Sequence, residues 1–193
     1  YPNSMSAIIP SRNRLIAELS ALIRCESVNT FGKTSPVGAE SAMADLFELQ
    51  LRSLGLEIGT HEVTTGRRNV WGSLKGIGTG PTILLAGHLD TVGVDGYNYP
   101  FDPIVKDGRI HGRGSCDMKA GLAAYLEVVR QLQCTGIPLS GDVIIAGVVD
   151  EEHAMTGSKD FGLYGPQVDY AIVAEPTLLQ ISTSHKGQIL TTI

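Results

Sequence analysis

The sequence lacks any apolar segment long enough to cross a lipid bilayer, although 42% of its 193 residues are hydrophobic. Since a membrane-spanning helix needs about 20 consecutive apolar residues, we expect no membrane partner. Positive charge is also scarce, because 15 Lys and Arg residues stand against 20 Asp and Glu residues, for a net charge of −5. A nucleic-acid-binding surface needs clustered basic residues, so these scattered charges predict no nucleic-acid partner.

Cysteine is rare as well. The three cysteines are Cys25, Cys116 and Cys134. Their odd number and irregular spacing argue against a disulfide framework and favour a reducing compartment. We therefore predict a cytoplasmic protein.

Two common enzyme signatures are absent. The Gly-x-Ser-x-Gly elbow of serine hydrolases does not occur, and no cysteine stands in a recognisable nucleophile context. The glycine-rich "GIGTG" at residues 76–80 precedes an apolar strand-like run, whereas a dinucleotide-binding loop follows a strand and opens a helix. Neither a serine or cysteine hydrolase nor a dinucleotide-binding protein is favoured.

The residue pattern alternates between helical and strand periodicity. Apolar spacing predicts helices over residues 11–26, 38–54 and 119–133. Strand patterns cover residues 56–63 and 69–76, and three more apolar runs predict buried strands over residues 82–88, 142–149 and 170–175. Buried strands that alternate with helices predict an α/β fold, here a three-layer αβα domain with a largely parallel central sheet.

Ionisable residues gather where the three buried strands end. They are His88 and Asp90 after the first strand, Asp150, Glu151 and Glu152 after the second, and Glu175 after the third. Asp117 lies in a glycine-rich connection that opens a helix. Each residue alone has an ordinary structural explanation, such as a helix cap for Asp117. Together they favour function, because acids crowded at one sheet edge repel each other unless a cation neutralises them.

The spacing of these residues also suits a metal site. His88 and Asp90 lie two positions apart, so they face the same side of an extended strand. Asp90 can accept a hydrogen bond from one imidazole nitrogen and leave the other nitrogen for a metal. Glu151 and Glu152 are adjacent and point in different directions, so one can bind metal while the other acts as a general base.

Four motifs, "GHLDTV", "GRGSCDMKAG", "VVDEE" and "AEPT", occur in this order. As a set they resemble the zinc-dependent deacylase and exopeptidase family, which includes acetylornithine deacetylase, succinyl-diaminopimelate desuccinylase, aminoacylase and glutamate-releasing carboxypeptidases. The resemblance implies a metal-dependent hydrolase that cleaves the amide bond of a small N-acyl amino acid. A dipeptidase or carboxypeptidase that cleaves short peptides, and a non-catalytic domain that binds metal or a partner, remain alternatives.

The resemblance also implies a role for each residue of the cluster. It implies two divalent metal ions, most simply zinc, with cobalt or manganese as other options. The implied metal ligands are His88, Asp117, Glu152 and Glu175, with Asp117 shared by both ions. The implied catalytic residues are Glu151 as general base and Asp90 as the residue that orients His88.

The sequence departs from the family pattern at its C-terminal end. The family's second metal takes a further histidine near the C-terminus, and its lid domain mediates homodimers; neither is found here. We therefore expect residues 1–187 to form the N-terminal portion of the catalytic domain and residues 188–193 to begin the connection to a missing lid. On this interpretation the second metal site is incomplete, and the 193-residue chain alone is inactive or nearly so.

Other polar residues near the motifs have weaker claims. Cys116 is expected to be a small buried filler, and Lys119 either pairs with a carboxylate or is solvated on its helix. The remaining histidines are His61, His111, His153 and His185. None of them matches a ligand position of the family, although His185 can lie on the substrate side or at a hinge.

Overall fold

The computed structural model describes residues 9–29 and 38–184. Its helices are α1 (Arg12–Arg24), α2 (Ala39–Ser53), α3 (Lys119–Cys134) and α4 (Thr156–Tyr164). Its strands are β1 (Glu57–Thr64), β2 (Arg67–Leu74), β3 (Ile83–His88), β4 (Ile104–Lys106), β5 (Arg109–His111), β6 (Val143–Val148) and β7 (Tyr170–Val173). The expected domain boundary between residues 187 and 188, and the candidate His185, lie outside the described residues.

The main sheet has five strands in the order β1-β2-β6-β3-β7. The three strands β6, β3 and β7 run parallel to one another, while β2 pairs antiparallel with both β1 and β6. The predicted α/β class with parallel central strands is therefore confirmed, and the first two strands add an antiparallel extension. Because β3, β6 and β7 are parallel, their carboxyl ends meet at one edge.

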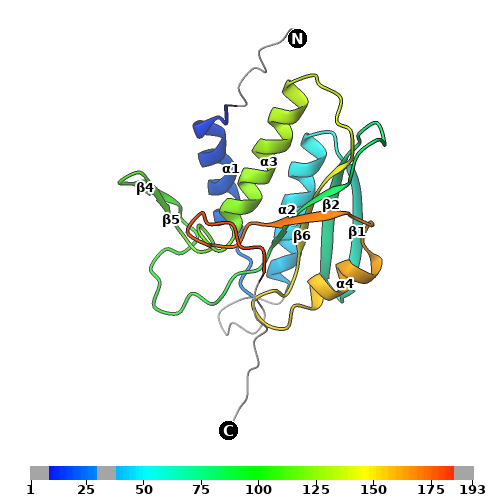
Figure 1. Cartoon of the computed structure of the whole chain (residues 1–193). Coiled ribbons are helices and arrows are strands. Elements are labelled where there is room, and N and C mark those ends of the chain that lie inside the picture. The colour runs from blue at the N-terminus through cyan, green and yellow to red at the C-terminus, as the bar shows by residue number, and fades with distance from the viewer. Residues whose placement is uncertain (1–8, 30–37, 185–193) are drawn as a thin grey trace.

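Helices cover both faces of this sheet, which gives three layers (Figure 1). Helices α1, α2 and α3 share one large apolar core with the sheet, built around Phe47, Leu126 and Ile145. On the other face, Phe161 of α4 packs against a smaller cluster that includes Trp71 and Ile144. Among the described residues, no helix is long and apolar enough to cross a membrane.

The first predicted helix forms for the expected reasons. The Ser11 side chain accepts a hydrogen bond from the backbone N–H of Arg14, which caps α1. Leu19, Leu22 and Ile23 recur at helical spacing and are buried against the core. Helices α2 and α3 likewise agree with their predicted ranges to within one or two residues.

Three parts of the fold differ from the sequence prediction. The third apolar run forms β7, but its four residues are exposed, so the prediction of a buried strand was wrong. β7 lies at the edge of the sheet and pairs only with β3 among the described strands. Helix α4 and the short β4–β5 hairpin were not predicted, since α4 holds two glycines and each hairpin strand has three residues.

Candidate metal centre

The parallel strands deliver the predicted site residues to one edge of the sheet. In the ladder between β3 and β6, His88 lies opposite Val148, so the residues after Val148 follow beside the end of β3. In the ladder between β3 and β7, Ala86 lies opposite Val173, and Glu175 comes two residues later. The strand-end residues are therefore neighbours because of sheet register, as expected for an open α/β sheet.

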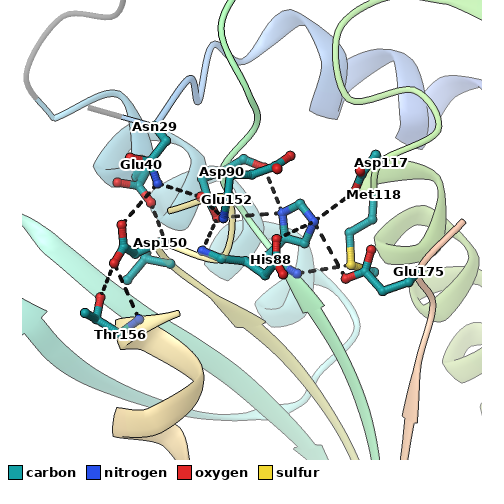
Figure 2. A network of polar contacts seen from close by, with 12 residues as sticks. Asn29, Glu40, His88, Asp90, Asp117, Met118, Asp150, Glu152, Thr156 and Glu175 are labelled. Carbon is teal, nitrogen blue, oxygen red and sulfur yellow. Dashed lines mark hydrogen bonds and ion pairs between the residues drawn. The ribbon is translucent and has the colours of Figure 1, made fainter. Parts of the chain in front are cut away.

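His88 lies at the centre of the cluster, and its side chain is only 1% exposed. Its Nδ1 atom lies 2.9 Å from the backbone carbonyl oxygen of Asp90. A proton on Nδ1 donates to that carbonyl, so Nε2 is the ring nitrogen available to a metal ion. Nε2 faces acids, at 3.0 Å from Asp117 and 3.7 Å from Glu175 (Figure 2). It also lies 3.8 Å from Glu151.

The carboxylate of Asp90 was expected to accept a hydrogen bond from the His88 ring, but it binds backbone N–H groups instead. It lies 3.6 Å from Nδ1 of His88, beyond hydrogen-bond distance, while the backbone carbonyl of Asp90 accepts the imidazole proton instead. The two carboxylate oxygens accept the backbone N–H groups of Glu151 and Glu152, at 3.1 and 3.0 Å. Asp90 therefore ties His88 on β3 to the loop that carries both glutamates.

Asp117 reaches the cluster from the glycine-rich connection before α3. It does not cap that helix, because the residue at the N-cap position is Met118 and no side chain caps it. The peptide bond between Asp117 and Met118 is cis. A Cβ atom on Gly121 would lie 2.6 Å from Cβ of Ala174, so glycine there lets α3 approach the segment that carries Glu175.

Among the described residues, two overlapping groups of side chains can each hold a metal ion. One consists of His88, Asp117 and Glu175, and the other of His88, Glu151 and Glu152, with candidate ligand atoms within 4.8 Å of one another. Bonds of about 2 Å place two ligands of one zinc ion up to about 4 Å apart, so the candidate atoms lie within about 1 Å of that spacing. All of the residues predicted as metal ligands or general base therefore converge within reach of metal ions.

The carboxylates in the cluster are held in an unfavourable environment without a cation. Burial raises the pKa of Glu152 to about 7, and the nearby Asp117 carboxylate adds to the shift. Burial also raises the pKa of Glu151 and Glu175, although His88 opposes both shifts. Burial alone would lower the pKa of His88, but the neighbouring carboxylates, Asp90 first, raise it. Mutual raising of acid pKa values is typical of like charges gathered for a cation.

The structure corrects two minor predictions next to Asp117. Cys116 is exposed, so it is not a buried filler. Lys119 is fully buried, and its ammonium group donates to the backbone carbonyls of Leu22 and Cys25 at the end of α1. Lys119 therefore satisfies carbonyls that a helix end leaves without partners, and burial lowers its pKa to about 8.

The other described histidines belong to neither metal-binding group. His61 on β1 pairs with Asp160 of α4 and stacks on Tyr164. His111 lies on β5 and is exposed. His153 lies 3.9 Å from Asp150, and its side chain is 42% exposed. Within the described ranges, His88 is the only histidine in either metal-binding group.

Sequence reasoning missed three polar residues that support the cluster. Asn29 donates to the carboxylates of both Asp90 and Asp150, at 2.8 and 3.1 Å. Glu40 and Arg67 contact each other, and each also bonds to Asp150. These three residues lie on segments before the first buried strand, and no motif in the sequence singled them out.

Comparison with known proteins shows which family the chain is related to. Residues 84–186, more than half of the sequence and all of the strand-end cluster, match Peptidase family M20/M25/M40. The chain belongs to this family. Membership in the M20 family implies binding of divalent metal ions, in agreement with the candidate groups around His88.

Curated relatives of this M20 family chain include two kinds of amide hydrolase. N-formyl-4-amino-5-aminomethyl-2-methylpyrimidine deformylase of Bacillus subtilis is 35% identical over 147 residues, which cover 73% of this chain and 34% of that protein. Acetylornithine deacetylase of Vibrio vulnificus is 31% identical over 172 residues, which cover 87% of this chain and 44% of that protein. The M20 chain thus spans less than half the length of these relatives.

Solved structures share the fold. A tripeptidase from Staphylococcus aureus superposes with a TM-score of 0.70 at 25% identity, over 86% of this chain and 44% of that one. The M20 family metallo-carboxypeptidase of Sulfolobus solfataricus gives a TM-score of 0.71 at 20% identity, over 83% of this chain and 37% of that one. The second likeness supports the fold alone.

The residues of this M20 chain fit divalent metal ions in their donor chemistry. One imidazole with several carboxylates suits zinc, cobalt or manganese better than copper or an iron–sulfur cluster. The direction of Nε2 of His88 toward the acids and the raised pKa values of those acids both indicate that positive charge belongs at this point.

Proposed function

We propose that this chain supplies the metal-binding part of a hydrolase that cleaves the amide bond of small N-acyl amino acids. The observation that carries the proposal is the orientation of His88. Its Nδ1 is held by the carbonyl of Asp90, while its Nε2 faces the carboxylates of Asp117, Glu175 and Glu151. A buried imidazole whose outer nitrogen is directed into a group of acids suits the metal-binding part of a hydrolase.

The residues divide into ligands and a base. His88, Asp117 and Glu175 would hold one ion, and Asp117 with Glu152 would hold the second, with zinc as the first choice and cobalt or manganese as alternatives. The second set has two protein ligands among the described residues, and the family resemblance implies a further histidine. Bound ions would supply the positive charge that polarises the amide carbonyl and stabilises the oxyanion formed from it.

Glu151 moves the proton in this proposal. Its carboxylate takes a proton from the attacking water as the water oxygen bonds to the carbonyl carbon. The carbon–nitrogen bond then breaks, and Glu151 returns the proton to the leaving amine. Burial raises the pKa of Glu151 above its ordinary value, which brings its proton affinity closer to that of a base working near neutral pH.

N-acyl amino acids are the leading substrate class because the relatives that exceed 30% identity include several acetylornithine deacetylases. Short peptides are the second class, since a tripeptidase shares the fold at 25% identity. A cytosolic location and a homodimer formed through a lid domain complete the proposal.

The test uses the product of the reading frame, extended to the length of the relatives where the frame continues past Ile193. We expect that product, loaded with Zn²⁺, Co²⁺ or Mn²⁺, to release ornithine from N-acetylornithine. Glu151→Gln removes the base and leaves the ligands, so it is expected to abolish turnover while bound metal, measured by mass spectrometry, is unchanged. Undiminished turnover in Glu151→Gln, or no amide cleavage with any of the three metals, contradicts the proposal.

The 193-residue chain itself serves as a comparison. We expect it to bind metal but to show at most trace turnover, because water exclusion and full charge stabilisation need a closed site. Hydrolysis by this chain at an ordinary enzymatic rate would show that the described residues suffice.

A further inference from the structure

The loop that carries the two catalytic-centre glutamates is held through its backbone. Three successive N–H groups, those of Asp150, Glu151 and Glu152, each donate to a carboxylate from another element. Asp90 accepts the second and third, and Glu40 accepts the first at 2.9 Å. Since side-chain direction follows backbone direction, these bonds determine where Glu151 and Glu152 point.

Asp150 is the residue at which the chain turns out of β6. Its φ angle is +63°, in the left-handed region that non-glycine residues rarely adopt. Its carbonyl accepts the N–H of Met155 at 2.7 Å, and its carboxylate accepts the Thr156 hydroxyl at 2.6 Å (Figure 2). The conformation of Asp150 therefore sets the path of the loop as far as the start of α4.

Glu40 reaches this turn from the first turn of α2, and it is 1% exposed. A carboxylate buried to this degree is costly unless it is paired and hydrogen-bonded. Its partner is Arg67 on β2, whose Nε donates to Glu40 and whose Nη2 donates to Asp150 at 2.9 Å. One guanidinium thus bridges the two carboxylates that fix the turn.

A simpler explanation is that Glu40 and Arg67 only fasten α2 to β2. The apolar core already does that, because Phe47 and Leu51 of α2 share it with Val70 of β2. For packing alone, an apolar pair of similar volume would be as stable or more stable than a buried ion pair. Glu40 also does not cap its own helix, which has no side-chain cap; its Oε1 is directed to the backbone of Asp150 instead.

We propose that Glu40 and Arg67 are positioning residues that fix the backbone at Asp150 and so direct Glu151 and Glu152 toward His88. The assignment rests on the proposed function only for the identity of the site as a metal centre. The mechanical part of the proposal is that Glu40 and Arg67 hold the loop. It rests on their hydrogen bonds to Asp150 and to each other, none of which involves a metal.

Hydrogen exchange of the metal-free chain tests this mechanical part directly. We expect Glu40→Ala to speed exchange of the amides of residues 150–152 about tenfold or more, relative to amides in the middle of α3. The matched control is Val129→Ala, a fully buried position on α3 that loses core packing without touching the loop. It is expected to speed exchange without singling out the loop.

Metal affinity provides the second readout. Loss of residues that support metal ligands typically weakens binding by about 10- to 100-fold, so Glu40→Ala is expected to weaken Zn²⁺ binding at least tenfold and Val129→Ala far less. Arg67→Lys keeps the charge but loses the two-pronged contact. If Glu40→Ala does not fold, the milder Arg67→Lys variant is measured in its place. It is expected to show the same faster loop exchange and weaker Zn²⁺ binding, with smaller changes.

The outcomes separate the two proposals. Loop amides that exchange no faster than the rest of the chain in both Glu40→Ala and Arg67→Lys overturn the positioning role. If the wild-type chain binds no Zn²⁺ while Glu40→Ala still speeds exchange in the loop, the metal centre is contradicted and the positioning of the loop is not. Unchanged Zn²⁺ affinity in variants whose loop has opened shows that the loop is held but that holding it does not serve the metal site, which also overturns the proposal.

Discussion

At the scale of single residues, the site depends on which hydrogen-bond partner each polar group has. His88 uses one nitrogen for structure and presents the other to the acids. Asp90, which is fully buried, receives N–H groups from Asn29, Glu151 and Glu152. These three donors make the Asp90 carboxylate a hydrogen-bonded link between the end of β3 and two other segments of the chain.

Replacing Asp90 by Asn is therefore expected to damage both folding and metal binding. The amide group of Asn would place N–H donors opposite N–H donors, leaving a buried donor unpaired at a cost of about 1–3 kcal/mol. Urea unfolding of the metal-free chain measures that cost, and Zn²⁺ titration measures an expected loss of about tenfold or more in affinity.

Asp95→Asn is the matched control, since Asp95 is an exposed residue in the loop that follows. It should change neither quantity measurably. Equal stability and affinity for Asp90→Asn and Asp95→Asn would show that the hydrogen bonds of Asp90 do not matter.

The sequence predicts single site residues where an ionisable side chain follows an apolar strand or precedes a helix. His88, Asp117, Glu151, Glu152 and Glu175 were chosen because they follow apolar strands or open a helix, and the fold brings them together. Glu40 and Arg67 could not be found in this way. Their contacts span residues far apart in the chain, and an acid near a helix start or an arginine on a strand usually lies in water.

At the scale of elements, a buried polar cluster joins α1 to α3. Glu127 of α3, whose side chain is 1% exposed, accepts from the backbone of Ser11 and from Arg14 at the start of α1. Arg130 and Gln131 on α3 also donate to it. The Arg14 hydrogen bond, the largest effect, holds the pKa of Glu127 far below its ordinary value.

Glu127→Gln is expected to lower the free energy of unfolding by about 1–3 kcal/mol at neutral pH. Because the folded-state pKa is depressed, the stabilisation is present above the ordinary carboxyl pKa and is lost as the pH falls below it. The wild-type advantage should therefore shrink in acid, as denaturant titrations at neutral and acidic pH can measure.

Glu57→Gln is the control for this change, because the side chain of Glu57 is 71% exposed beside Lys75. An exposed pair contributes about 0–1 kcal/mol, so little loss is expected. A wild-type advantage over Glu127→Gln that stays constant into acid would refute the link between that carboxylate and the acid sensitivity of the chain.

The elements that the sequence predicted well are those with long, regular apolar periodicity. Helices α1, α2 and α3 and strands β3 and β6 all have a buried apolar face, and a face of that kind leaves a clear pattern. β7 is as apolar as β3, but an apolar run cannot tell a central strand from an edge strand. Helix α4 is short, with Gly157 as its one buried residue, so its pattern was weak.

At the scale of the whole molecule, the crowded acids make stability depend on pH and metal. The pKa of Glu152 is about 7 in the folded chain against an ordinary value of 4.5. Between these values the folded state binds more protons than the unfolded state, so the free energy of unfolding falls as the pH rises. The raised pKa values of Glu151, Glu175 and His88 act in the same direction.

We therefore expect the metal-free chain to lose stability from this cluster between about pH 5 and about pH 7.5. Glu152→Gln should flatten that loss, because it removes the group with the largest shift in this window. Zn²⁺ should restore stability at the higher pH by binding the deprotonated acids of the folded state. Denaturant titrations across this pH range, with and without chelator, make the comparison. If stability falls as steeply with rising pH in Glu152→Gln as in the wild type, Glu152 is not the cause of the loss.

Zinc titration of the 193-residue chain by calorimetry, beside its His88→Ala variant, tests the central claim most directly. The account predicts that the wild-type chain binds Zn²⁺ with release of protons, and that His88→Ala keeps its circular dichroism spectrum but loses this binding. A wild-type chain that binds no Zn²⁺, or a folded His88→Ala chain that binds it equally well, would contradict a metal centre built around His88.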